Sequence, residues 1–209
     1  MSKNVSGNAL VSGSARVSDN ASVSDNASVY GNASVYDNAS VSDNASVSGD
    51  ALVYGSALVS ENASVSGSAG VSGSALVYGD ARVYGDARVY GNALVYGDAY
   101  VYNDAYVYGN AIVFGEADIQ CNNDWFSFIY KGKTLTGYRS RNKQGYELNI
   151  DGEDVSIEDL GDIIADLVNY LIREFTPFES KNNTKIELEK VISDLSEKLE
   201  TAKNKLKNL

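Results

Sequence analysis

The sequence has no histidine, one cysteine (Cys121), one proline (Pro177) and one tryptophan (Trp125) in 209 residues. Without histidine, zinc sites that rely on Cys and His spacing are excluded. A single cysteine excludes an intrachain disulfide and fits a reducing compartment, and we expect Cys121 to be a small buried residue. No Ser or Cys can be paired with a base for nucleophilic catalysis. We therefore expect a protein that is not an enzyme and has no metal or cofactor.

Long apolar runs and an excess of positive charge are also missing. No segment has the length of a transmembrane helix, and no charged-then-apolar leader opens the chain, so we expect a soluble, cytoplasmic protein. The net charge is −11, with about −8 in residues 1–118 and about −3 in the remainder. This balance argues against binding that is dominated by phosphate contacts. We expect neither a nucleic-acid partner nor a membrane partner.

A six-residue repeat without interruption organises the first half of the chain. Val stands at every sixth position from Val5 to Val113, and Ala at every sixth position from Ala9 to Ala117, which makes nineteen hexads. The position two residues after each Val is Gly thirteen times and otherwise Asp, Glu or Asn. Such a fixed short period sets the architecture before any propensity is considered.

Each hexad reads as a short strand followed by a tight corner. β-Branched Val suits a strand and points inward, Gly, Asn and Asp suit a corner with positive φ, and Ala fits where walls meet. No proline removes a backbone donor from the repeat. Three hexads per coil would give about six coils, roughly 30 Å in total height.

This pattern resembles the hexapeptide-repeat superfamily. The resemblance implies a mainly β fold, a left-handed parallel β-helix with a triangular cross-section. The best-known members are acyltransferases, which use a histidine as general base, and γ-class carbonic anhydrases, which bind metal through histidines. Neither role can be transferred to a chain without histidine. The chain also looks like hexapeptide proteins of phage and mobile elements, which implies a non-catalytic member that could sequester a nucleotide signal.

Residues eighteen apart should stack if each coil holds three hexads. Leu58, Leu76, Leu94 and Ile112 then form an outward apolar wall, which predicts an interface with other copies or with the chain's own C-terminal helix. The other walls carry Tyr pairs together with one arginine each. We select eight candidate ligand-binding residues: Arg82, Tyr84, Arg88, Tyr90, Tyr102 and Tyr108, followed by Arg139 and Arg141.

Tyrosine rings and guanidinium groups suit planar anionic ligands. We therefore expect a homotrimer, or a multiple of three, that holds a small anionic nucleotide-like ligand in clefts between subunits. The alternative is a structural scaffold without a ligand, in which the Tyr ladders only stabilise the coils. DNA mimicry and ice binding fit less well, because the acidic columns are short and the repeat has no Thr array.

The remainder divides into a small α+β domain at 119–178 and a linker with a C-terminal helix at 179–209. Strands are expected at 125–130, 134–139 and 146–150, with a helix from Ser156 that ends at Pro177. We expect the small domain to pack on the open end of the β-helix or on its own copies. The last helix has a short heptad seam, which favours a coiled coil.

Overall fold

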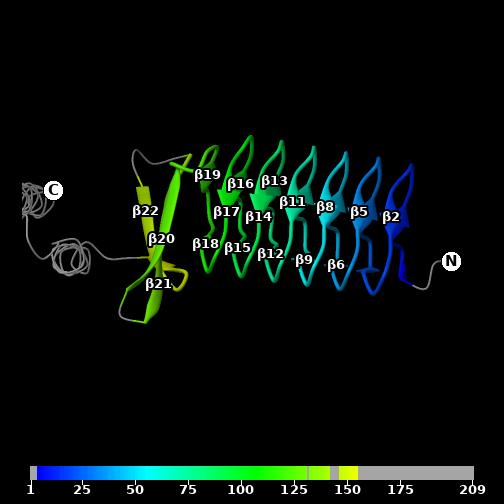
Figure 1. The fold of residues 1–209 in the computed structure, drawn as a ribbon, viewed down its shortest axis with the longest axis horizontal. Coiled ribbons are helices and arrows are strands. Elements are labelled where there is room, and N and C mark those ends of the chain that lie inside the picture. The colour runs from blue at the N-terminus through cyan, green and yellow to red at the C-terminus, as the bar shows by residue number, and fades with distance from the viewer. Residues whose placement is uncertain (1–3, 131, 142–145, 155–209) are drawn as a thin grey trace, which may run out of the picture. The chain divides into compact units, whose positions relative to one another are not determined.

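The computed structural model describes residues 4–130, 132–141 and 146–154. The expected helices from Ser156 onward, including the heptad seam, lie outside these residues. The described part forms one compact unit, in which a parallel β-solenoid is followed by a small antiparallel sheet. Its coils stack from the N-terminal end to β19 (Figure 1). The predicted parallel β-helix of about six coils is confirmed.

Three parallel sheets form the walls of the solenoid, and we name each by its outward residues. The Arg82 wall contains β1 (Leu10–Val11), β4 (Ser28–Val29), β7 (Ser46–Val47), β10 (Ser64–Val65), β13 (Arg82–Val83), β16 (Tyr100–Val101) and β19 (Asp118–Ile119). The Arg88 wall contains β2 (Arg16–Val17), β5 (Ser34–Val35), β8 (Leu52–Val53), β11 (Gly70–Val71), β14 (Arg88–Val89) and β17 (Tyr106–Val107). The Leu wall contains β3 (Ser22–Val23), β6 (Ser40–Val41), β9 (Leu58–Val59), β12 (Leu76–Val77), β15 (Leu94–Val95) and β18 (Ile112–Val113).

The register is the predicted one, because each residue pairs with the residue eighteen positions later. Arg82 pairs with Tyr100, and Leu76 pairs with Leu94. From Ala21 to Ala117 the Val and Ala columns are 0–1% exposed and make up a continuous core. Most outward neighbours of Val are exposed or half-buried, as alternation along a strand requires.

All corners of the repeat use the left-handed backbone region. The third position of each hexad has φ between 53° and 75°, whether it is Gly, Asp, Glu or Asn. At Gly91 an added Cβ would lie 3.0 Å from the backbone N of Gly109 in the next coil, so most of these corners leave no room for a side chain. Where Asp37 replaces Gly, its carboxylate accepts the N–H of Gly55 in the next coil at 3.1 Å.

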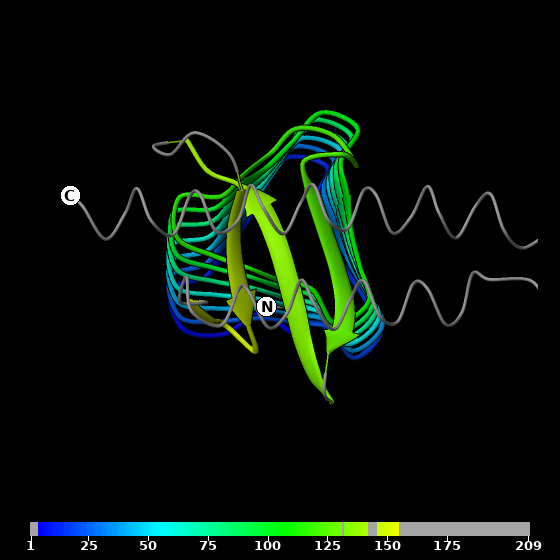
Figure 2. The same cartoon turned by 90° about the vertical axis from the view of Figure 1, so that its left-hand side faces the viewer.

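The antiparallel sheet has the order β20 (Trp125–Tyr130), β21 (Lys133–Arg139), β22 (Tyr146–Ile150) and β23 (Glu153–Asp154). Figure 2 shows β20 and β21 lying across the end of the last coil. The sheet packs on the end of the β-helix, one of the two packing options that the sequence left open, and packing on other copies stays a prediction.

Side chains of this sheet and of the preceding loop satisfy backbone groups that have no further coil to pair with. Thr136 Oγ1 accepts the N–H of Ile112 at 3.1 Å, and Asn149 Nδ2 donates to the Ile112 carbonyl at 3.0 Å. On β17, Asn122 Oδ1 accepts the N–H of Tyr106 at 2.7 Å, and Trp125 Nε1 donates to the Tyr106 carbonyl at 2.7 Å. The sheet therefore acts as a cap that closes the strand edges of the last coil.

Candidate functional site

The Arg82 wall carries the densest group of predicted site residues. Tyr84 and Tyr102 begin the corner that follows this wall, and their rings stack with centroids 5.0 Å apart. Tyr100 lies on the wall itself, in β16, and its ring packs edge-on against Tyr84 with centroids 6.3 Å apart. Each corner Tyr follows an inward Val, so it points outward and meets its neighbour one coil away.

Two guanidinium groups lie against Tyr100. The Cζ of Arg82 is 5.4 Å from the ring centroid, and the Cζ of Arg141 is 3.7 Å from it. Arg82 reaches Tyr100 because the two are paired in register. Arg141 comes from the segment after β21, where its backbone N–H bonds to the Glu116 carbonyl at 3.0 Å and its Nη2 bonds to the Asp98 carbonyl at 2.7 Å. Both arginines are exposed.

A shallow depression of about 450 Å³ lies beside these residues. It is lined by Asn62, Ser64, Ser66, Arg82, Tyr84 and Tyr100. Within the described residues, no carboxylate forms an ion pair with Arg82. The depression therefore offers a positive group, hydroxyls and aromatic rings to a ligand.

Asp118 places a negative charge on β19, the last strand of the Arg82 wall. The hydroxyl of Tyr102 donates a hydrogen bond to Asp118, and burial together with this carboxylate raises the pKa of Tyr102 to about 12. Burial also raises the pKa of Tyr84, with Asp118 acting in the same direction and Arg141 and Arg82 opposing it. An anion would thus be placed at the Ser64 and Arg82 end, away from Asp118.

The Arg88 wall holds a second, separate group. Tyr90 and Tyr108 stack at the following corner with centroids 5.3 Å apart, and Tyr108 meets Trp125 edge-on at 5.1 Å. Arg88 lies over Gly70, where an added Cβ would be 3.2 Å from its Nη1. This arginine covers a position without a side chain and lies on a different wall from Arg82 and Tyr84.

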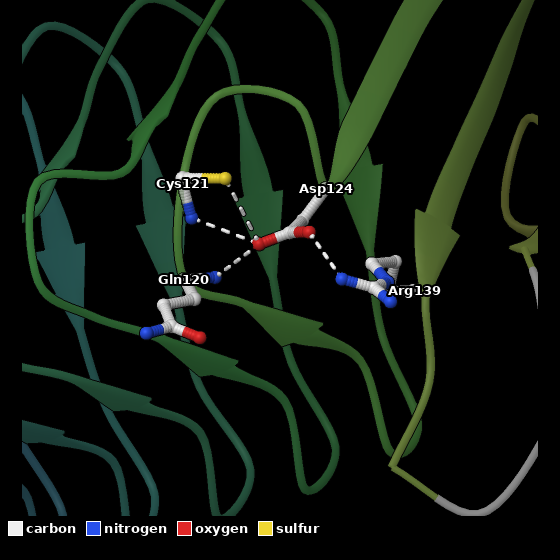
Figure 3. A network of polar contacts seen from close by, with 4 residues as sticks. All are labelled: Gln120, Cys121, Asp124 and Arg139. Atoms are coloured by element: carbon white, nitrogen blue, oxygen red, sulfur yellow. Dashed lines mark hydrogen bonds and ion pairs between the residues drawn. The ribbon is translucent and has the colours of Figure 1, made fainter.

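Arg139 belongs to the capping sheet rather than to either wall. Its Nη1 forms an ion pair with Asp124 Oδ1 at 3.1 Å (Figure 3). Asp124 Oδ2 accepts the backbone N–H groups of Gln120 and Cys121 at 3.0 and 2.9 Å. Burial opposes ionisation of Asp124, yet the hydrogen bonds from Cys121, Arg139 and Gln120 outweigh it and lower its pKa. The network holds the turn after β19 in place.

The expectation that Cys121 is buried is wrong. Its side chain is exposed, and Sγ donates to Asp124 Oδ2 at 3.3 Å. The turn after the last coil directs the thiol toward the carboxylate rather than into a core. Across the described residues, no group of three or more His, Cys, Asp or Glu is placed to hold a metal ion.

The structure thus brings Arg82, Tyr84, Tyr102 and Arg141 together and leaves Arg88, Tyr90, Tyr108 and Arg139 elsewhere. The selection from sequence omitted Tyr100, Asp118 and Asp124. The eighteen-residue register could have found Tyr100 and Asp118, because they share a column with Arg82. Asp124 lies beyond the repeat, where no periodic signal exists.

A family profile described as the YdcK beta solenoid repeat matches residues 5–19, 45–61 and 87–103. The chain is a β-solenoid repeat protein of the hexapeptide type. The matched segments all lie within the hexads and together cover less than half of the chain. No curated protein matches the sequence. In the described part of this β-solenoid, no helix has the length and apolar character needed to cross a bilayer.

Proposed function

We propose that this β-solenoid is a non-catalytic, homo-oligomeric binding protein that sequesters a small anionic, nucleotide-like ligand. The observation that carries the proposal is the pair of arginines, Arg82 and Arg141, on the Tyr100 ring beside a depression that also includes Tyr84. Guanidinium groups pair with phosphate oxygens, and tyrosine rings stack on a planar base.

The oligomer is supported by the Leu wall. Leu58, Leu76 and Leu94 pair in register and are half-buried, which leaves a column of apolar side chains on the surface. At the C-terminal end of the column, Gly152 lies against Ile112 and Tyr96, so among the described residues the turn between β22 and β23 packs on this end. A trimer formed through this wall would bury the column and place the Arg82 wall beside a neighbouring subunit.

Native mass spectrometry of gently purified protein, followed by calorimetric titration with a panel of nucleotides, tests the proposal. We expect a multiple of three chains and saturable nucleotide binding. Arg82→Ala combined with Arg141→Ala should weaken binding by at least about 100-fold, since charged hydrogen bonds contribute roughly 1.5–3 kcal/mol each. Arg16→Ala is the matched control, because Arg16 is an exposed outward arginine on β2 of the Arg88 wall, four coils before Arg88 and outside the depression.

Two results would overturn the proposal: an unchanged affinity in the double variant, or no binding to any nucleotide of the panel. A monomer, also when ligand is added, would remove the clefts between subunits. Leu76→Glu adds a second check, because a charge in the Leu wall should dissociate the oligomer while the coils remain folded.

The second candidate is a structural scaffold without a ligand. It is favoured by the third corner, where Tyr78, Tyr96 and Phe114 stack in the same way and no cation–π contact with a described arginine is seen. Ring stacking at all three corners indicates that the ladders stabilise coil packing. The nucleotide panel separates the two candidates.

A further inference from the structure

A second cavity lies between the last coil and the overhanging capping sheet. Its volume is about 370 Å³, within the range typical of small-molecule sites. It is lined by the corner Tyr108 to Asn110 below, and by Asn122, Trp125, Ser127 and Thr134 from the loop and strands above. We call this cavity the overhang cleft. It is on a different wall from Arg82 and independent of the proposed nucleotide site.

Backbone N–H groups of the last coil line the overhang cleft, because the described part of the chain has no further coil there to accept their hydrogen bonds. In the preceding coil, the N–H groups of Tyr90 and Asn92 donate to the carbonyls of Val107 and Gly109 in the next coil. Tyr108 and Asn110 hold the same positions in the last coil, and among the described residues their N–H groups have no such acceptor. These two backbone donors point toward the cleft, where another coil would otherwise lie.

Side chains add further donors to the overhang cleft. Asn110 Oδ1 accepts a hydrogen bond from Asn92 at 3.0 Å, so the Nδ2 of Asn110 is the last donor in this column of side-chain amides. Asn122 uses Oδ1 for the Tyr106 N–H, which leaves its Nδ2. Ser127 Oγ accepts from Thr136 at 3.3 Å and keeps its own hydrogen to donate. The hydroxyl of Thr134 makes no hydrogen bond to a described residue.

Charge is what distinguishes this cleft from the depression on the Arg82 wall. None of the described residues that line it carries a charge, and the chain as a whole has a net charge of −11. Among the described lining residues an anion would meet no cation, and the net charge of the chain gives a repulsive long-range field. The donors therefore suit a neutral ligand that is rich in oxygen.

The aromatic residues indicate the shape of that ligand. Tyr108 is 48% exposed and meets Trp125 edge-on, so the lining of the cleft combines aromatic rings with amides and hydroxyls. A pyranose has the matching faces, with C–H groups that pack on an aromatic ring and hydroxyls around the rim. We propose that the overhang cleft binds a neutral saccharide of one or two pyranose units.

Trp125 makes the proposal directly testable, because it is the only tryptophan of the chain and lines the cleft. The full-length protein is titrated with cellobiose, maltose, lactose and chitobiose while the tryptophan emission is recorded. We expect a saturable change with at least one disaccharide. Asn110→Ala should weaken that binding by about tenfold, the loss of roughly one to two hydrogen bonds.

Asn38→Ala is the matched control, since Asn38 is an exposed asparagine at the equivalent position of the same corner, four coils earlier. It should bind like the original protein. The proposal is overturned if no disaccharide of the panel changes the emission, or if Asn110→Ala leaves the change intact. It is also overturned if inorganic phosphate alone gives the same saturable change, because the cleft would then be an anion site.

Discussion

The guanidinium of Arg141 lies 3.7 Å from the centre of the Tyr100 ring, although the two residues belong to different parts of the fold. Tyr100 is on a solenoid wall, and Arg141 follows the second strand of the capping sheet. The same contact joins the cap to the last coils and completes the group around Arg82. The contact therefore links the stability of the cap to the proposed ligand site.

Tyr100→Leu should weaken this link, whereas Tyr100→Phe should preserve it. A cation over an aromatic ring contributes about 0.5–1 kcal/mol at an exposed site, and Phe keeps the ring. Urea unfolding of both variants measures the difference in the free energy of unfolding. A double-mutant cycle with Arg141→Ala isolates the ring contact from the bond to the Asp98 carbonyl. A coupling energy near zero would contradict the prediction.

Asp124→Ala should destabilise the C-terminal end of the solenoid by about 2–4 kcal/mol, because it leaves the N–H groups of Gln120 and Cys121 without their acceptor. Arg139→Ala is the control and should cost less than about 1 kcal/mol, since the Arg139 side chain is 62% exposed. Denaturant unfolding followed through Trp125 emission measures both. Equal losses of unfolding free energy in the two variants would show that the ion pair with Arg139, and not the two N–H bonds, accounts for most of the stabilisation by Asp124.

Thr136→Val combined with Asn149→Leu should reopen the strand edge at β18. The double variant leaves both backbone groups of Ile112 without partners, and an exposed strand edge promotes edge-to-edge association. We expect larger assemblies that grow with protein concentration in light scattering. Ser127→Ala is the control, because Ser127 contacts Thr136 but not Ile112. A double variant with unchanged mass would contradict the capping role.

Gly91→Ala should cost more stability than Gly109→Ala, although both glycines have the same position at one corner and φ of 75° and 70°. Both variants should lose about 1–2 kcal/mol of unfolding free energy, because each places a non-Gly residue in the left-handed region. Only at position 91 would the Cβ also lie 3.0 Å from backbone of the next coil, whereas nothing lies within 4 Å at position 109. Thermal and denaturant unfolding of the pair should show the additional loss at Gly91.

Tyr102 should ionise near pH 12 rather than near pH 10, because burial and its hydrogen bond to Asp118 favour the neutral phenol. Since the folded-state pKa is raised, its contribution to stability is fully present below pH 10 and is lost as the pH rises through about 12. The absorbance titration of the original protein minus that of Tyr102→Phe isolates this group. Asp118→Asn should move the titration back toward lower pH.

The sequence alone determined the solenoid. Each hexad repeats the same local environment, so Val at one position implies an inward Val in every coil and Gly or Asp at the corner implies positive φ. The spacing of eighteen residues then gave the partners of Arg82 and Leu76 and the Tyr84–Tyr102 stack. The same spacing identifies Tyr100 as the residue that pairs with Arg82 in the next coil.

Beyond Ile119 the sequence predicted the strands at 125–130, 134–139 and 146–150, which β20, β21 and β22 confirm, but only the tertiary structure decided which partners the side chains of the cap find. Arg139 and Arg141 are two residues apart in sequence and look equivalent, yet one pairs with Asp124 and the other lies on Tyr100. Cys121 is exposed because a turn, not a core position, follows the last coil. The contacts of the cap occur once in the molecule and not once per coil, so no periodic pattern in the sequence predicts them. Among the described residues, the side chains of the cap contact the solenoid only at its last coils.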